Sequence, residues 1–313
     1  MIARRALPLL AAPAFAQETP LRVVIPFPPG GPADTIARLL EPRLRAALGQ
    51  PLVLDHRSGA GGVVGMEQVA RARPDGQTIG LGSTGALVIA PHLMARMPYD
   101  PVRDLIAVGE VLSVPQLLVV PAAFEARDVA QLVAIARARP GALSYASAGI
   151  GSSLHLAAEL FRQRAGIEIT HVPYRGAAPA IVDLVAGRVQ LMLGDVPGLL
   201  SQLRGGTIRA LGITSTSRFA DLPEVPTVIE AGVPGVVSES FYGIFAPAGV
   251  APARIAELSR ALLGALAEPE LRLALTALGG TIIASTPDNF AARLREVSAG
   301  WAEVIRVGGI RAE

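Results

Sequence analysis

Short apolar runs alternate with helical patterns along almost the whole chain, and this alternation limits the possible folds more than any other feature. Leu21–Ile25 and Thr78–Leu81 have the length of buried strands, whereas Thr35–Leu48 and Leu154–Ala165 repeat apolar residues with a helical period. Strands that alternate with helices are typical of α/β folds with largely parallel sheets, because a parallel connection needs a crossover segment. We therefore expect an α/β protein.

Two extended segments are longer than the other strand candidates, and they suggest how the chain is divided. Val111–Val120 and Val236–Ala246 are the natural entry and exit strands of an inserted domain. We expect domain 1 to comprise residues 17–118 plus 241–313 and domain 2 to comprise residues 119–240. Two adjacent crossing strands would form a hinge, with a ligand cleft between the domains.

Residues 1–16 have the pattern of a signal peptide. Arg4 and Arg5 form a basic start, Ala6–Phe15 is apolar, and Ala14-Phe15-Ala16 is a small-residue cleavage site. About ten apolar residues are too few to cross a bilayer. We expect secretion to the periplasm. The chain has no cysteine for a disulfide or a lipid anchor.

The charge pattern argues against nucleic acids and nucleotides. All 28 basic residues are arginine, and without Arg4 and Arg5 the 26 that remain equal the 26 acidic residues. No basic stripe favours nucleic acid, and a P-loop needs a lysine. Gly149–Leu154 ends in leucine where a dinucleotide fingerprint has its third Gly or Ala. We expect no cofactor.

Catalytic and metal-binding patterns are also missing from the sequence. There is no Gly-x-Ser-x-Gly elbow and no cysteine nucleophile. The four histidines, His56, His92, His155 and His171, are scattered and form no i,i+4 pair. We therefore expect no catalytic residues and no metal.

Four loops between a strand and a helix are rich in small and polar residues, and they are the candidate binding site. They are Pro26–Asp34, Gly82–Gly85, Ser147–Ser153 and Pro173–Gly176. Such loops follow the carboxyl ends of strands, where α/β folds bind ligands, and helix N-termini attract anions. Capping alone also explains each loop. Asp34 fits an N-cap before Thr35 equally well, and Asp195 either faces the cleft or starts a turn.

The same loops carry a resemblance to a known family. Pro26-Phe27-Pro28-Pro29-Gly30-Gly31-Pro32-Ala33-Asp34 is joined by Pro74-Asp75-Gly76, Met97-Pro98-Tyr99-Asp100-Pro101, His171-Val172-Pro173-Tyr174-Arg175-Gly176 and Leu222-Pro223-Glu224-Val225-Pro226-Thr227. In this order and spacing, the mature chain resembles the periplasmic receptors of tripartite tricarboxylate transporters, also called Bug-type solute receptors.

The resemblance implies a two-domain periplasmic-binding-protein fold, type II-like, that closes around a small organic carboxylate. It implies that loop backbone and bridging water hold the carboxylate. The ligand-binding residues that it implies are Phe27, Pro29, Gly31, Asp34, Ser83 and Thr84 on domain 1, Gly149, Ser152, Ser153, Tyr174 and Asp195 on domain 2, and the aromatics Phe241 and Tyr242.

The chain departs from the family pattern at Thr84-Gly85-Ala86-Leu87, at Ile150 and at Gly194-Asp195. Because these positions carry fewer polar side chains than the family pattern, we expect a less polar mono- or dicarboxylate rather than an amino acid or a tricarboxylate. We expect a monomeric, non-enzymatic receptor that delivers its ligand to membrane permease subunits. The alternatives are a sensor that presents its loaded form to a sensor kinase, and a secreted hydrolase. An effector-sensing domain of a transcription regulator has a related architecture but no leader.

Overall fold

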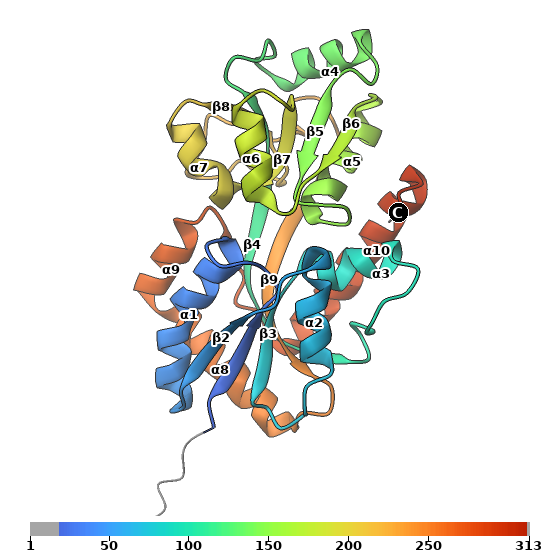
Figure 1. Ribbon diagram of the computed structural model, residues 1–313. Coiled ribbons are helices and arrows are strands. Elements are labelled where there is room, and N and C mark those ends of the chain that lie inside the picture. Colours follow the sequence, from blue (N-terminus) through green and yellow to red (C-terminus); the bar gives the residue numbers. More distant parts are fainter. Residues whose placement is uncertain (1–18, 312–313) are drawn as a thin grey trace, which may run out of the picture.

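Strand β4 (Leu105–Pro121) crosses the waist of the molecule and joins the two lobes seen in Figure 1. In the computed structural model, which describes residues 19–311, β4 pairs antiparallel with β9 (Glu239–Pro247) from Leu105 to Pro115. From Gln116 to Pro121 it pairs instead with strands of the upper lobe. The expected signal peptide lies outside the described residues.

The lower lobe of Figure 1 is built on strands in the order β2-β1-β3-β9-β4. β1 (Leu21–Ile25) pairs parallel with β2 (Leu52–His56) and β3 (Thr78–Ser83), while β9 pairs antiparallel with β3 and β4. The short β10 (Thr281–Ile282) adds to β4. Parallel pairing is thus confined to the outer strands of this lobe.

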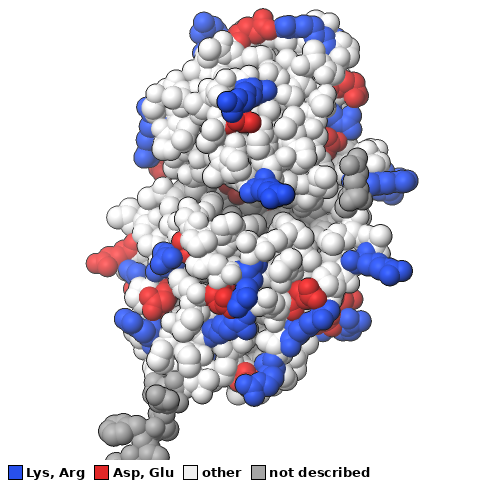
Figure 2. Space-filling model, viewed as in Figure 1, with Lys and Arg blue, Asp and Glu red and all other residues white. Residues whose placement is uncertain are grey.

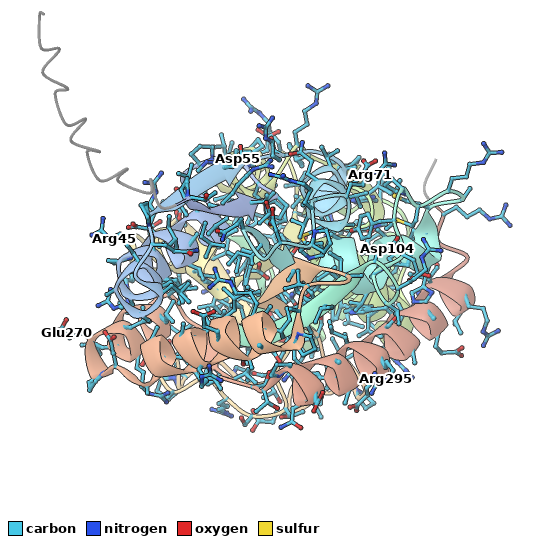
Figure 3. The ribbon with its side chains drawn as sticks, turned by 90° about the horizontal axis from the view of Figure 1, so that it is seen from below. Arg45, Asp55, Arg71, Asp104, Glu270 and Arg295 are labelled. Atoms are coloured by element: carbon cyan, nitrogen blue, oxygen red, sulfur yellow. The ribbon has the colours of Figure 1, made fainter. Side chains whose placement is uncertain are left out.

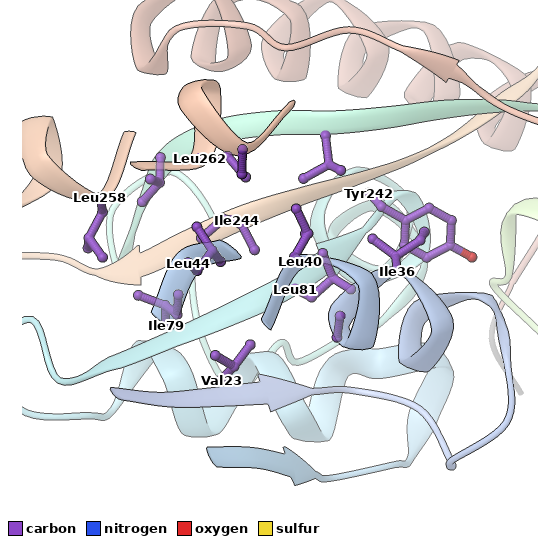
Figure 4. Close-up of a cluster of buried hydrophobic side chains, with 14 of the residues drawn as sticks. Val23, Ile36, Leu40, Leu44, Ile79, Leu81, Tyr242, Ile244, Leu258 and Leu262 are labelled. Atoms are coloured by element: carbon purple, nitrogen blue, oxygen red, sulfur yellow. The ribbon is translucent and has the colours of Figure 1, made fainter. Parts of the chain in front are cut away.

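Helices cover both faces of the lower sheet. One face carries α1 (Pro32–Leu48), α8 (Pro252–Ala267) and α9 (Pro269–Thr276). Figure 4 shows Ile36, Leu40 and Leu44 of α1 packed beside Leu258 and Leu262 of α8. The other face carries α2 (Val63–Ala70), a π-helical turn η2 (Gly85–Ile89), α3 (Ala90–Leu93) and α10 (Pro287–Gly308). A 3-10 turn, η1 (Ala60–Gly62), precedes α2.

The upper lobe repeats this arrangement around β5 (Ser144–Ser147). β5 lies parallel between β6 (Thr170–Pro173) and β7 (Leu191–Asp195), and β8 (Ile208–Ile213) pairs with β4. α4 (Val129–Ala138) and α5 (Ser153–Ala165) pack on one face, and α6 (Ala177–Val185) and α7 (Val196–Arg204) on the other. Both lobes therefore follow α/β rules, as the sequence predicts.

Local signals explain where the main helices begin and end. Gly31 is the N-cap of α1, Pro32 is its first residue, and Gly49 ends it with a φ of 65°. The alternative in which Asp34 caps a helix that begins at Thr35 is wrong, because the turn has already started at Pro32. Thr286 caps α10 by accepting a hydrogen bond from the Asn289 N–H, and Pro287 follows as the first helical residue.

Most charged side chains lie on the outside of this framework, whereas Asp34, Glu110 and Glu159 are buried. Figure 3 views the lower lobe from below, with α8 and α10 along one side and the labelled Arg45, Asp55 and Glu270 near the periphery. Among the described residues, no helix is long and apolar enough to cross a membrane.

Candidate ligand-binding site

A furrow separates the two lobes, and the candidate loops line it. Figure 2 shows this furrow across the middle of the molecule, with mostly uncharged walls on the visible face. The loops after β1 and β3 reach it from the lower lobe, and the loops after β5, β6 and β7 reach it from the upper lobe. Helices α1, α5 and α7 begin at these loops, so the N–H groups of their first turns face the furrow.

Asp34 shapes the loop between β1 and α1. One carboxylate oxygen accepts hydrogen bonds from the Gly30 N–H and the Arg38 guanidinium, both at 2.9 Å, and the other lies 2.7 Å from Nε2 of His56. Burial alone would raise the pKa of Asp34, but these hydrogen bonds lower it to about 2. Its oxygens are thus occupied by the protein, and Asp34 acts on the loop rather than as a free group in the furrow.

The rest of this loop presents little side-chain polarity. Phe27 is partly buried and packs on the lower core, and Pro29 is exposed. Gly31 has extended backbone, with φ −88° and ψ 176°, at the very start of α1. The polar groups available to an anion here are mainly those of the backbone.

The loop after β3 brings the two lobes into contact. Ser83 and Thr84 are buried, and Thr84 Oγ1 accepts a hydrogen bond from the Phe241 N–H at 2.8 Å. A β-carbon built on Gly85 would lie 3.5 Å from the Gly151 carbonyl oxygen of the upper lobe. The Thr84 hydroxyl therefore ties β3 to the hinge strand β9, and Gly85 leaves room for the opposing loop.

The loop after β5 is held from behind by serines and histidines. Ser152 caps α5: its Oγ accepts from the His155 N–H and donates to the Gly149 carbonyl. Nδ1 of His155 accepts from the Gly151 N–H, and Ser147 Oγ lies 2.7 Å from Nε2 of His171. Gly149 has a φ of 121°, which L-residues rarely adopt. The loop backbone is therefore well fixed.

Tyr174 lies in the loop after β6, and its hydroxyl donates to Asp183 of α6 at 2.8 Å. Burial and this acceptor raise the pKa of Tyr174 to about 12. The hydroxyl is thus committed within the upper lobe, and only the ring and backbone remain for a ligand.

Asp195 is the centre of a polar cluster where the hinge strands cross. Its Oδ1 accepts from Nε2 of Gln116 at 3.2 Å and from the Ser240 hydroxyl at 2.8 Å. Ser240 Oγ also accepts from Gln116 and lies 2.8 Å from Ser153 Oγ at the start of α5. Burial raises the pKa of Asp195 to about 6, although the two hydrogen bonds oppose the shift.

Tyr242 and Phe241 point to opposite sides of β9, as successive residues of a strand must. Tyr242 lies opposite Ser83 in the pairing of β3 with β9, and Figure 4 shows its hydroxyl pointing away from the core cluster. Burial, together with the nearby Asp195 carboxylate, raises its pKa. The family resemblance implies that the Phe241 and Tyr242 rings line the cleft together. The Phe241 ring is instead buried and packs edge-on against Phe290 of α10, with ring centroids 5.5 Å apart.

Two residues of this cluster, Gln116 and Ser240, are absent from the sequence-based site. Gln116 was visible as a polar residue inside the apolar run Val111–Val120. Its partner Ser240 lies 124 positions away, and only the strand pairing brings them together. A buried amide inside a strand is a usable signal, because it must find hydrogen-bond partners.

A shallow hollow of about 430 Å³ lies elsewhere, at the amino-terminal ends of β1 and β3. Its charges are mutually paired: Arg22 and Arg57 both contact Asp55, and Arg73 lies 3.6 Å from Asp75. Within residues 19–311 no group of three potential metal ligands occurs. The furrow therefore remains the candidate site.

Two α/β lobes joined by crossing strands, with helix N-termini facing a furrow between them, define the two-domain fold of periplasmic binding proteins. The chain belongs to the tripartite tricarboxylate transporter receptor family, whose model matches residues 36–310. This finding confirms the family resemblance.

Individual relatives agree along nearly the whole chain. Protein BugT of Bordetella pertussis is 38% identical over 306 residues, covering 96% of this chain and 94% of BugT. A Rhodopseudomonas palustris protein solved with adipate is 34% identical, with a TM-score of 0.89 over 93% of this chain and 98% of its own. MatC from the same species, solved with bound malate, is 32% identical, with a TM-score of 0.85 over 91% and 98%.

Proposed function

We propose that this chain is a periplasmic receptor that captures a small organic carboxylate and delivers it to a membrane transporter. The observation that carries the proposal is the convergence of helix N-termini and neutral hydroxyls on one furrow, in a family of solute receptors. Relatives solved with adipate and with malate, both dicarboxylates, support the dicarboxylate part of the expected mono- or dicarboxylate class.

The N-terminus of α1 is the proposed grip on the carboxylate. Its first N–H groups have no partner within the helix, and the helix dipole adds partial positive charge there. Ser153 at the start of α5 faces the same furrow from the upper lobe. Closure of the lobes would remove water and strengthen these interactions, so the ligand would favour the closed state.

A single substitution at the N-cap separates ligand binding from stability. Gly31→Asp gives α1 a slightly better cap, which stabilises a helix by only a few tenths of a kcal/mol over glycine, but places a negative charge where the carboxylate would bind. Ala251→Asp makes the same change at the cap of α8, which starts away from the furrow. We expect both variants to fold, and only Gly31→Asp to lose ligand.

The ligand panel uses hexanoate, adipate, malate and citrate, with the melting temperature as readout. Saturation a hundredfold above Kd adds about 2.7 kcal/mol, which corresponds to roughly 5 °C or more for a chain of this size. Stabilisation by citrate alone would contradict the proposed ligand class. Equal ligand binding by Gly31→Asp and the wild type would contradict the proposed grip.

The transport role needs a separate measurement. Cells that carry the cognate permease should take up the labelled acid only when this receptor is present. Undiminished uptake without it would favour the sensor role, and conversion of the bound acid, followed by NMR, would favour an enzyme.

A further inference from the structure

The Asp195 carboxyl presents one free oxygen at the base of the furrow. Gln116 and Ser240 both donate to Oδ1. Oδ2 accepts no hydrogen bond from any residue within 19–311, and Asp195 is partly exposed. The two donors therefore hold the carboxyl in one orientation, with Oδ2 left for a ligand atom.

Within residues 19–311, no side chain that contacts Asp195 carries a positive charge. β4 contributes the neutral Gln116, β9 contributes Ser240 and Tyr242, and α5 contributes Ser153. Among the described residues no arginine or histidine forms an ion pair or a hydrogen bond with Asp195. Arg293, near the hinge, is directed at Glu110 and Glu239 instead. A second negative charge beside Asp195 would therefore be strongly unfavourable.

Two carboxyl groups in such a place can coexist by sharing one proton, as adjacent carboxylates in proteins do. We propose that the ligand is a dicarboxylate whose far carboxylate shares one proton with Asp195, so that capture takes up a proton from solvent. The inference rests on the proposed function and specifies its ligand class. Three observations support this inference. Oδ2 is free, two donors hold Oδ1, and no described cation pairs with Asp195.

The direction of the pH effect follows from the protonation of the free receptor. The pKa of Asp195, about 6 because of burial, means that the group is mostly ionised at pH 8 and largely protonated at pH 5.5. Above pH 6, the ionised Asp195 must take up a proton from solvent before it can share one with the ligand, so Kd rises by up to about tenfold per pH unit.

The test uses adipate and hexanoate, which have the same chain length but differ by one carboxylate. Calorimetric titration in two buffers of different ionisation enthalpy gives the number of protons taken up. At pH 8 we expect about one proton per adipate and none per hexanoate, from the linkage between binding and ionisation. We also expect the Kd for adipate to rise about tenfold per unit between pH 7 and 8.

Asp195→Asn sharpens the test, because its amide donates a hydrogen bond as the protonated carboxyl would. The variant should bind adipate at pH 8 at least as tightly as the wild type, without proton uptake. Glu110→Gln removes another buried carboxyl, outside the proposed site, and should keep the proton uptake of the wild type.

Two results would overturn the inference. Adipate binding without proton uptake is one, and it is read from the wild type alone, even if the Asn variant does not fold. Weaker adipate binding by Asp195→Asn than by the wild type at every pH is the other, because a permanent hydrogen-bond donor would then fail to replace the shared proton. No binding of either acid or of malate at any pH would instead contradict the proposed function itself.

Discussion

The imidazole rings of His155 and His171 stack behind the loop after β5, with centroids 4.0 Å apart and planes 10° from parallel. His171 also stacks on Tyr145, at 4.8 Å. Each histidine holds the loop through one ring nitrogen, His155 through Gly151 and His171 through Ser147. The stack is therefore compatible with neutral rings and would be disturbed by a proton.

The histidine stack predicts acid sensitivity. Burial lowers the pKa of both rings to about 4, from about 6.5 in an unfolded chain. Between these values the unfolded chain binds more protons, so stability falls as the pH falls from 6.5 to 4. The wild type should lose about 3 kcal/mol more than His155→Gln between pH 7 and pH 4, measured by urea unfolding. Parallel pH curves for the two proteins would contradict this assignment.

Asp34→Asn should loosen the β1–α1 loop. The substitution removes charge-assisted hydrogen bonds to Gly30, Arg38 and His56, and we expect a loss of about 2 kcal/mol at pH 7, with weaker ligand binding. Because the pKa of Asp34 is about 2, against an ordinary value of 3.8, the difference from wild type should persist at pH 5 and shrink as the pH falls from about 4 to 2. Glu41→Gln in the same helix breaks one long ion pair with Arg45 and should change stability by less than about 0.5 kcal/mol.

Glu110→Gln should become more favourable as the pH rises. Glu110 is fully buried in β4, and neither carboxyl oxygen has a hydrogen-bond partner. Burial raises its pKa to about 7, so the wild type loses stability as the pH rises from 4.5 through 7. The unfolding free energy of the variant relative to wild type should increase by about 3 kcal/mol between pH 4.5 and pH 8. A constant difference would show that Glu110 stays ionised.

Gly243→Ala should destabilise the crossing of β4 and β9. A β-carbon there would lie 2.3 Å from Cε1 of Phe290, so the ring must shift, which typically costs about 1–3 kcal/mol. Phe290→Leu should recover part of this loss. Gly264→Ala, inside α8 with nothing within 4 Å, should instead stabilise by up to about 1 kcal/mol. Chemical denaturation of the three variants and the double variant measures all four values.

Periodic segments could be predicted from the sequence almost to the residue. The expected strand Leu21–Ile25 agrees with β1, and the expected helix Leu154–Ala165 differs from α5 by one residue at its start. β4 could not be predicted in full, because Gly109 and Glu110 interrupt its apolar pattern before Val111 and only pairing with β9 keeps them in a strand.

The candidate site could likewise be predicted only in part. Its loops could be found because glycine, proline and serine mark them locally. The cluster of Gln116, Ser240 and Asp195 could not, because it depends on the register between β4, β7 and β9. The different surroundings of Phe241 and Tyr242 have the same origin, since a strand sequence does not state which face meets the core.

The crossing at β4 and β9 has a consequence for engineering. The chain enters and leaves the upper lobe through two neighbouring strands, so that lobe is a cassette with two junctions side by side. Exchanging the cassette between family members at these junctions would keep the α1 end of the furrow and import the loops of another receptor. Chimeras of this kind offer a direct route to receptors with new ligand preferences, and to biosensors that report them.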